Sequence, residues 1–495
     1  MTGVVPTVRR AEVEGVPLFS VDHPGRVHAS LVFGVGIRDE SPTTCGITHL
    51  VEHLAMRQTA QDGQVNASVS SSVTQFDVVG HADFVAGHLE QVCRALGNLD
   101  LGPLDLERGV LRAEEAGQEG GAWAVGMHYG TRGPGMVGLP QVGVDLVTAE
   151  QVRSWTSRWF HHGNVALAVS GEIPARLHLP LPAGRPVPRT TPQPLPLRTP
   201  AWMPDVEGVQ AAMRAEWSAE LVAGLDALRD RLMKSLRYDA GLVYDVLADA
   251  VGVDAATAVV SLGVDVSGPA VWTTVQSLLD VLDGLCADGP TEAELERNRN
   301  RLVEALAEPD LIRDMPVAEA AHHLTGIVPD HHHYASALQG VDPADVARAL
   351  HSARQTLVLG VPETHVVHRL PQLPVCTATP VVGRTLGRRR FGSAVPRGSA
   401  LTVAPDGLTM RVGADGPECT IRFDEVAFVA TEPTPDGPDG DDVHIVVSTD
   451  GALLMVRAKD WKDGADAVDA IEVAVPGRLR YRTPERLRRF GRSPS

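Results

Sequence analysis

The sequence predicts an α+β protein with two homologous α/β domains followed by a small β-rich domain. Strand and helix patterns alternate twice in the same order, and each run ends on a short hydrophobic strand. A proline-dense stretch without periodicity separates the two runs. After Pro371 the pattern changes to short strands broken by the turn signals "PDG", "ADGP" and "TDG". The predicted division is an N-terminal domain at 1–175, a linker at 176–205, a second domain at 206–370, a linker at 371–400, a small domain at 401–485 and a basic tail at 486–495.

The elements of the N-terminal domain follow from apolar periodicity and residue type. Loose alternation predicts a strand at 27–38, and an apolar-periodic helix begins near Gly46 to Thr48. The segment 64–80 is rich in β-branched and small residues, which predicts one strand. The remaining predicted elements are helices at 84–99 and 103–118 and a buried strand at Asn164–Pro174.

The second domain repeats this order. Its predicted elements are a strand at 209–217, a helix at 221–237, a strand at 257–266, a helix at 271–289, a helix at 291–308 and a strand at 356–361. Thr291 and Glu294 have the spacing of a capping box at the start of the helix at 291–308. In the small domain, short strands precede a helix at 459–474, and this pattern coarsely resembles a pleckstrin-homology-like β-barrel with a C-terminal helix.

Composition limits the class of partner and the compartment. The 44 basic and 62 acidic residues give a net charge of −18, which disfavours nucleic acid and anionic membranes as main partners. No apolar run approaches the roughly 20 residues that span a bilayer, and the N-terminus lacks a signal-peptide pattern. We therefore expect a cytoplasmic protein. The five cysteines form no CxxC pair, so neither a disulfide framework nor a thiolate zinc site is indicated.

One short motif carries chemistry. In "GITHLVEHLAMRQ", from Gly46 to Gln58, His49 and His53 are four residues apart, so on a helix both face the same side. Glu52 lies beside them, where a carboxylate could take a proton from a metal-activated water. H-x-x-E-H is the inverzincin signature. The alternative is chance in a chain with 19 histidines, and the motif alone does not decide between the two.

A catalytic zinc needs a further protein ligand. The helix containing "ERGVLRAEE" offers Glu107, Glu114 and Glu115. Glu107 and Glu114 are seven residues apart and lie on nearly the same face, whereas Glu115 is rotated by about 100° from Glu114. A solvated acidic face is the alternative, but beside a His-x-x-Glu-His helix the metal interpretation is favoured.

These residues together resemble the pitrilysin/insulinase family of zinc metallopeptidases. "GVGIRDES" and "CGITHLVEH" are similar to the strand, loop and zinc helix of that family, and "ERGVLRAE" is similar to its third-ligand helix. The resemblance implies zinc held by His49, His53 and Glu114, with Glu107 as a supporting acid that orients the site and Glu52 activating water. It covers roughly residues 10–370 and implies two pitrilysin-like domains forming a half-clamshell.

The resemblance also suggests where a substrate binds. "NASVSSSVTQF" is similar to the family's edge strand, where a peptide pairs as an added strand, so Asn66, Ala67 and Ser68 are candidate substrate-binding residues. The chain departs from the family at Val69, Ser72 and Phe76, and its spacing from His53 to Glu114 is short, which puts substrate preference in doubt.

In the second half, "LRYDAGLVYDV" resembles a motif whose arginine and tyrosine reach the active site of the first domain. The matching residues are Arg237 and Tyr244. The alternative is an ordinary helix-to-strand connection, and the position of the motif favours the functional interpretation.

The family resemblance implies a zinc-dependent endopeptidase acting on peptides or unfolded segments, as a homodimer or a heterodimer with a related subunit. The alternative is a non-catalytic or conditionally active peptide-binding subunit, for example in the maturation of a peptide natural product. Two of the remaining histidine clusters, at 161–162 and 331–333, are predicted to be structural or solvated, and the pair at 322–323 is predicted to be part of a helix.

Overall fold

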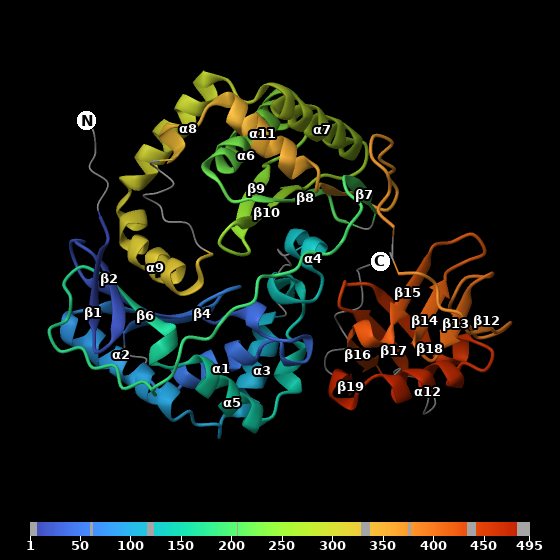
Figure 1. Cartoon of the computed structure of the whole chain (residues 1–495), viewed down its shortest axis with the longest axis horizontal. Coiled ribbons are helices and arrows are strands. Elements are labelled where there is room, and N and C mark those ends of the chain that lie inside the picture. Colours follow the sequence, from blue (N-terminus) through green and yellow to red (C-terminus); the bar gives the residue numbers. More distant parts are fainter. Residues whose placement is uncertain are drawn as a thin grey trace. The chain divides into compact units, whose positions relative to one another are not determined.

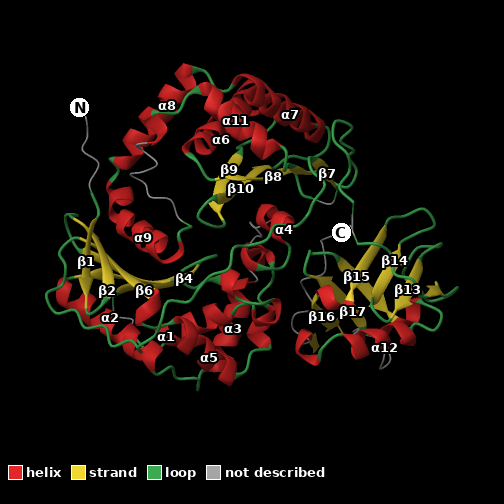
Figure 2. Cartoon of the chain, in the orientation of Figure 1, coloured by secondary structure: helices red, strands yellow, loops and turns green. Residues whose placement is uncertain are grey.

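The structure is a computed structural model, and it describes residues 7–59, 63–115, 123–204, 206–327, 337–374, 378–432 and 442–482. Figures 1 and 2 show the arrangement of its helices and strands. The chain divides into two compact units. The larger unit comprises Met1–Glu40, Cys45–His128 and Gly133–Leu373, and the smaller unit comprises Ser41–Thr44, Tyr129–Arg132 and Pro374–Ser495.

The first half of the larger unit is built on a six-stranded sheet with the order β1-β2-β6-β3-β5-β4. Only β2 and β6 run parallel, and the other neighbours are antiparallel. The strands are β1 (Arg9–Val13), β2 (Val16–Val21), β3 (Val27–Phe33), β4 (Gln64–Val69), β5 (Thr74–Gly80) and β6 (Val165–Ser170). The helices are α1 (Ile47–Met56), α2 (Ala82–Gly97), α3 (Leu104–Glu115), α4 (Trp123–Tyr129) and α5 (Ala149–Trp159). The apolar faces of α1, α2 and α5 pack on one face of this sheet and form the core of the half.

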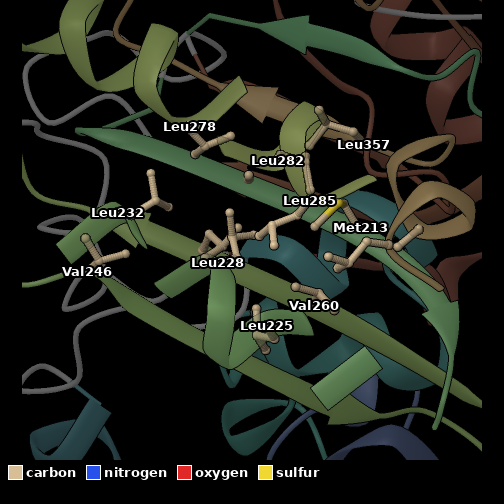
Figure 3. Packing of buried hydrophobic residues seen from close by; sticks show 14 of the residues in the cluster. Met213, Leu225, Leu228, Leu232, Val246, Val260, Leu278, Leu282, Leu285 and Leu357 are labelled. Atoms are coloured by element: carbon tan, nitrogen blue, oxygen red, sulfur yellow. The ribbon is translucent and has the colours of Figure 1, made fainter. Parts of the chain in front are cut away.

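The second half has a five-stranded sheet with the order β7-β11-β8-β10-β9. Its strands are β7 (Ala201–Met203), β8 (Val209–Glu216), β9 (Leu247–Gly252), β10 (Thr257–Val264) and β11 (Val358–Gly360). Its helices are α6 (Ala219–Leu232), α7 (Ala270–Asp288), α8 (Glu292–Leu306), α9 (Pro309–Thr325) and α11 (Pro343–Arg354), with a π-helix at Met233–Asp239. Leucines of α6 and α7 pack on the sheet and form its core (Figure 3). The predicted capping box of Thr291 and Glu294 is present at α8.

The two halves share one strand topology. The parallel pair β7–β11 matches β2–β6, and β8, β10 and β9 follow antiparallel in the places of β3, β5 and β4. Each sheet ends on a strand with the same alternation of exposed and half-buried residues, β4 in the first and β9 in the second. The repeated order seen in the sequence is therefore a repeat of the fold.

Helix α9 joins the halves, because it packs on the first sheet opposite that sheet's own helices. Ala320 and Ala321 of α9 are buried against Phe19 of β2 and Val32 of β3. The hydroxyl of Ser170, at the end of β6, donates to the main-chain carbonyl of Arg313. Both faces of the first sheet are thus covered, one by its own helices and one by a helix of the second half.

Three predictions about the elements need correction. The strand predicted at 27–38 ends at Phe33, and Ile37–Asp39 forms a short 3-10 helix. The single strand predicted at 64–80 is a hairpin of β4 and β5, because Ser70 closes a turn: its side-chain oxygen accepts from the Val73 amide at 3.1 Å. The linker predicted at 176–205 contains β7, which pairs with β11.

The smaller unit consists of two four-stranded sheets around one core. The first has the order β12-β13-β14-β15 and the second β18-β17-β16-β19. The strands are β12 (Arg384–Gly387), β13 (Ala400–Ala404), β14 (Gly407–Arg411), β15 (Glu418–Arg422), β16 (Val426–Glu432), β17 (Val443–Ser448), β18 (Leu453–Arg457) and β19 (Arg480–Arg482), and the helix is α12 (Ala465–Ala474). Strand β12 lies in the segment predicted as a linker. A pleckstrin-homology relationship of this unit stays a prediction.

Candidate metal centre

Helix α1 presents an apolar face to the core and a polar face outward. Leu50, Val51 and Leu54 are fully buried, whereas His49 and His53 lie on the other side and are partly exposed. The helix starts at Gly46, whose φ of 95° is a left-handed conformation that favours glycine. A side chain at this position would also collide with Val144.

Glu40 caps this helix. Its carboxylate accepts from the amides of Gly46 at 2.7 Å and Thr48 at 2.9 Å, which are donors that no preceding turn can satisfy. Glu40 is buried, and this burial raises its pKa to about 7 against the opposing effect of its hydrogen bonds. Capping by a glutamate six residues before the helix is not visible in the sequence motif.

Three of the predicted residues converge. Ligand atoms of His49, His53 and Glu114 all lie within 4.8 Å of one another. Glu114 Oε2 is 3.6 Å from His49 Nε2 and 3.5 Å from His53 Nε2. Burial lowers the pKa of His49, and the neighbouring His53 lowers it further, which favours the neutral imidazole that a metal requires. The arrangement is one that can hold a divalent cation.

Glu52 lies at the same point. Its Oε2 is 3.6 Å from His49 Nε2 and 3.7 Å from His53 Nε2. The side chain is buried, and burial raises the pKa of Glu52 to about 7; His53 opposes this rise and Glu114 adds to it. A carboxylate with a pKa near neutrality can both accept and release a proton.

Glu107 supports the second histidine. One of its carboxylate oxygens is 3.1 Å from Nδ1 of His53, and the other accepts from Arg57 Nη1 at 2.7 Å. Glu107 is buried, so water does not compete with His53 and Arg57 for its carboxylate. The contact leaves Nε2 of His53 directed at Glu52 and Glu114.

A residue outside the predicted set supports the first histidine. Gln141 Oε1 is 3.2 Å from Nδ1 of His49. The segment that carries Gln141 also binds helix α3, because Arg108 donates to the carbonyls of Val144 and Val147 and Arg112 pairs with Asp145. Residues 141–147 therefore tie the helix of the two histidines to the helix of Glu114. No motif marks this segment, and only its place in the fold identifies it.

The structure does not bring the two residues of the second half to the cluster. Arg237 lies over the ring of Tyr244, with 4.9 Å from Cζ to the ring centroid, and Tyr244 is 84% exposed. Among the described residues, no hydrogen bond or ion pair joins either of them to His49, His53 or Glu114.

The predicted substrate residues lie on an open strand. Asn66, Ala67 and Ser68 belong to β4, which pairs only with β5 within the described sheet and so forms its edge. Asn66 and Ser68 are exposed. The side chain of Glu115, the other carboxylate considered as a ligand, lies outside the described residues.

The other histidine clusters have separate outcomes. His161 is buried; one of its ring nitrogens accepts from the amide of Gly163 and the other lies 2.9 Å from the carbonyl of Arg158. His322 and His323 lie in helix α9, as predicted. Residues 331–333 lie outside the described part of the chain. Within that part, no helix combines the length and apolar character needed to cross a membrane.

Comparison with known proteins gives one sequence match. Residues 218–302 match the family model described as the Peptidase M16 inactive domain. This segment belongs to the second half and contains none of the converging residues. A comparison with curated protein sequences finds no significant match.

Solved structures of peptidases resemble the chain over most of its length. A peptidase M16 inactive domain from Pseudomonas fluorescens matches 73% of this chain and 100% of its own, with a TM-score of 0.60 and 16% identity. A protease from Helicobacter pylori matches 72% and 100%, with a TM-score of 0.59 and 17% identity. Pitrilysin matches 79% of this chain and 52% of its own, with a TM-score of 0.55 and 14% identity. The chain therefore has the fold of M16-type peptidase structures, and its second half matches the M16 inactive domain in sequence.

Proposed function

We propose that the protein is a zinc-dependent peptidase whose metal ligands are His49, His53 and Glu114. The convergence of these three side chains within 4.8 Å, beside the carboxylate of Glu52, is the observation that carries the proposal. Two ligands bound to one tetrahedral zinc lie about 3.4 Å apart, given Zn–N and Zn–O distances of about 2.0–2.1 Å. The distances from Glu114 to the two imidazoles, 3.6 and 3.5 Å, agree with that separation.

The local charge supports a cation. Three carboxylates, those of Glu52, Glu107 and Glu114, surround the two imidazoles, and the only arginine paired with them among the described ion pairs is Arg57. With neutral imidazoles, the carboxylate of Glu114 is left without a cationic partner, and so is that of Glu52 once it is ionised. A divalent cation balances this charge, and the imidazole nitrogens favour zinc over magnesium or calcium, which prefer oxygen ligands.

The residues of the chain divide the chemistry among them. Zinc held by His49, His53 and Glu114 would lower the pKa of the attacking water and polarise the scissile carbonyl. Glu52 accepts the proton of the attacking water and passes it to the leaving amine. Glu107 and Gln141 hold the two imidazoles in the orientation that directs Nε2 inward.

The substrate is proposed to be an extended peptide that pairs with β4. The edge of a sheet offers unpaired main-chain groups, and an added strand uses them without regard to most side chains. Asn66, Ala67 and Ser68 lie along that edge. Arg237 and Tyr244 are proposed to contact the peptide from the second half, because Tyr244 is exposed.

A dimer is proposed as the working form. The structural matches cover most of this chain but only 52% of pitrilysin and 55% of PqqL, a periplasmic protease from Escherichia coli. A second copy or a related subunit would supply the missing half. Size-exclusion chromatography of the purified chain, alone and with any related subunit, tests this.

A second candidate function is a non-catalytic peptide-binding subunit. The description of the matched family model as an inactive domain favours it. The matched residues, 218–302, lie apart from the converging ligands, so the match does not speak against catalysis by the first half.

One experiment separates the two functions. Purified protein is assayed for zinc content and for cleavage of a peptide library by mass spectrometry. The peptidase proposal predicts about one zinc per chain, and Glu52→Gln should abolish cleavage while keeping the metal. Protein that contains no zinc after reconstitution, with the ligands intact, overturns the proposal; protein that binds peptides without cleaving them supports the second candidate.

A further inference from the structure

Three consecutive residues between β3 and helix α1 each contact a different part of the larger unit. We propose that Arg38, Asp39 and Glu40 form one rigid link through which the second half of the chain sets the position of the metal-binding helix. Arg38 is then a positioning residue for the peptidase reaction, and this inference rests on the proposed function.

Arg38 reaches the second half. Its Nη1 donates to the main-chain carbonyl of Val253 at 2.6 Å, in the turn between β9 and β10. Arg38 is 9% exposed and Val253 is 1% exposed, so water does not compete for this bond. The turn is itself fixed, because the Val253 amide donates to the carbonyl of Thr257. On its other side the carbonyl of Ile327, just beyond α9, packs so closely on Gly252 that a side chain there would not fit.

Asp39 binds the segment that connects the halves. Its carboxylate accepts from Arg189 Nη2 at 3.0 Å and from the Gly36 amide at 2.9 Å. The same nitrogen of Arg189 lies 2.8 Å from the carbonyls of Gly34 and Ser72. Arg189 thus holds the end of β3 and the turn after β4 against the residue that precedes Glu40.

Glu40 completes the path to the metal site. Its two oxygens bind the amides of Gly46 and Thr48, one residue before His49. Among the described residues, no main-chain carbonyl accepts from these two amides, which lie at the free N-terminal end of the helix. The position of Glu40 therefore decides where the first turn of the helix lies.

The backbone between these side chains has little freedom. The amides of Asp39 and Glu40 bind the carbonyls of Gly36 and Ile37 within the short 3-10 helix. The amides of Ile37 and Arg38 bind the carbonyls of Ser70 and Ser71, each at 3.0 Å. A displacement of the β9–β10 turn must therefore move both the start of α1 and the end of β4, which are the metal site and the proposed substrate edge.

The test compares variants of the full-length protein. Arg38→Met keeps the length of the side chain and removes the donor, Arg38→Lys keeps one donor, and Arg26→Ala removes an exposed arginine of the same half as a control. We measure kcat and KM on a cleaved peptide, zinc content, and amide hydrogen exchange at Gly46 and Thr48.

The link predicts a specific pattern. Arg38→Met lowers kcat by about tenfold or more with a smaller change in KM, because misplacement of catalytic groups acts on the chemical step. Zinc content stays at the wild-type level, exchange at Gly46 and Thr48 becomes faster, and Arg38→Lys restores part of both effects. Arg26→Ala behaves as the wild type.

The outcomes are distinguishable. If Arg38→Met leaves kcat and the exchange at Gly46 and Thr48 unchanged, the link is wrong. If exchange rises equally in α2, Arg38 only stabilises the fold, and the link is again wrong. If the wild-type protein neither binds zinc nor cleaves peptides, the proposed function fails, whereas local exchange in the variants still decides whether the link exists.

Discussion

The helix pair α1–α3 of the first half and the pair α6–α8 of the second half occupy matching places in the repeated fold, but different side-chain contacts hold each pair together. In the second half, α6 and α8 are joined by two ion pairs, Arg231 with Glu294 and Arg301 with Asp230, each with contacts near 3 Å from two nitrogens of the arginine. In the first half, α1 and α3 meet through His53 and Glu107 and through the cluster around Glu114.

The same strand topology therefore carries two helix contacts of different charge. Opposite charges close the α6–α8 pair, because each of the two arginines is matched by a carboxylate of the facing helix. The α1–α3 pair carries more carboxylates than cations, and its imidazoles and carboxylates point at one spot. Because the strand order is the same in both halves, the difference between the two pairs comes from the residues at the helix contact.

The largest effect is expected when a proposed metal ligand is removed. His53→Ala should reduce the zinc content from about one per chain to near zero and abolish cleavage, since a catalytic zinc site needs three protein ligands and only two would remain. Zinc content by mass spectrometry and peptide cleavage check this. A variant that keeps its zinc would show that the ligand set is wrong.

In metal-free protein, Glu52 should make the free energy of unfolding depend on pH. Burial raises the pKa of Glu52 from 4.5 to about 7, so the folded protein holds this proton more tightly than the unfolded chain does. The contribution of the protonated carboxyl to the free energy of unfolding is therefore full below pH 4.5 and is lost as the pH rises through 7. Glu52→Gln mimics the protonated form, so it should raise the free energy of unfolding at pH 8 by roughly 2–3 kcal/mol and change it little at pH 4. Urea unfolding of chelator-treated protein at both values measures this, and an equal gain at both would contradict it.

The contact of Gln141 with His49 offers a smaller effect. Gln141→Leu should weaken zinc binding by about tenfold, because an unsupported imidazole loses its orientation. Competition with a chelator measures the affinity. Gln193→Leu, at an exposed glutamine, serves as the control and should leave the affinity unchanged.

The smallest effect is expected in the second half. Asp230→Ala removes the partner of Arg301 on α8, and a partly exposed ion pair contributes about 0.5–1 kcal/mol. Thermal or urea unfolding should show this loss with zinc content and cleavage unaffected. Loss of zinc in this variant would mean that the two helix pairs are not separate in function.

The converging residues could be predicted because their relations are local. Residues four apart on one helix share a face whatever surrounds them, and Glu107 and Glu114 repeat after two turns. That the two helices meet does not follow from these local relations, because His53 and Glu107 are 54 positions apart; the resemblance to the pitrilysin/insulinase family implies it.

The supporting residues could not be predicted, because their partners are distant or irregular. Arg189 lies in a stretch that looks like a plain linker, and its partners are more than a hundred positions away. Gln141 belongs to a segment without periodicity. The hairpin at 64–80 was missed because its turn is made of serines rather than glycine or proline, and β1, β2, α5, β9 and α11 carry patterns too short or too polar to stand out.

The packing of α9 on the first sheet has a consequence for synthesis on the ribosome. Phe19 and Val32 emerge early, but the helix that covers them spans Pro309–Thr325. Until that helix has left the exit tunnel, one apolar face of the first sheet is exposed to water, because no described element of its own half covers it. The N-terminal half therefore cannot finish folding until Thr325 has left the tunnel, and a gene truncated before codon 309 would yield a product prone to aggregation.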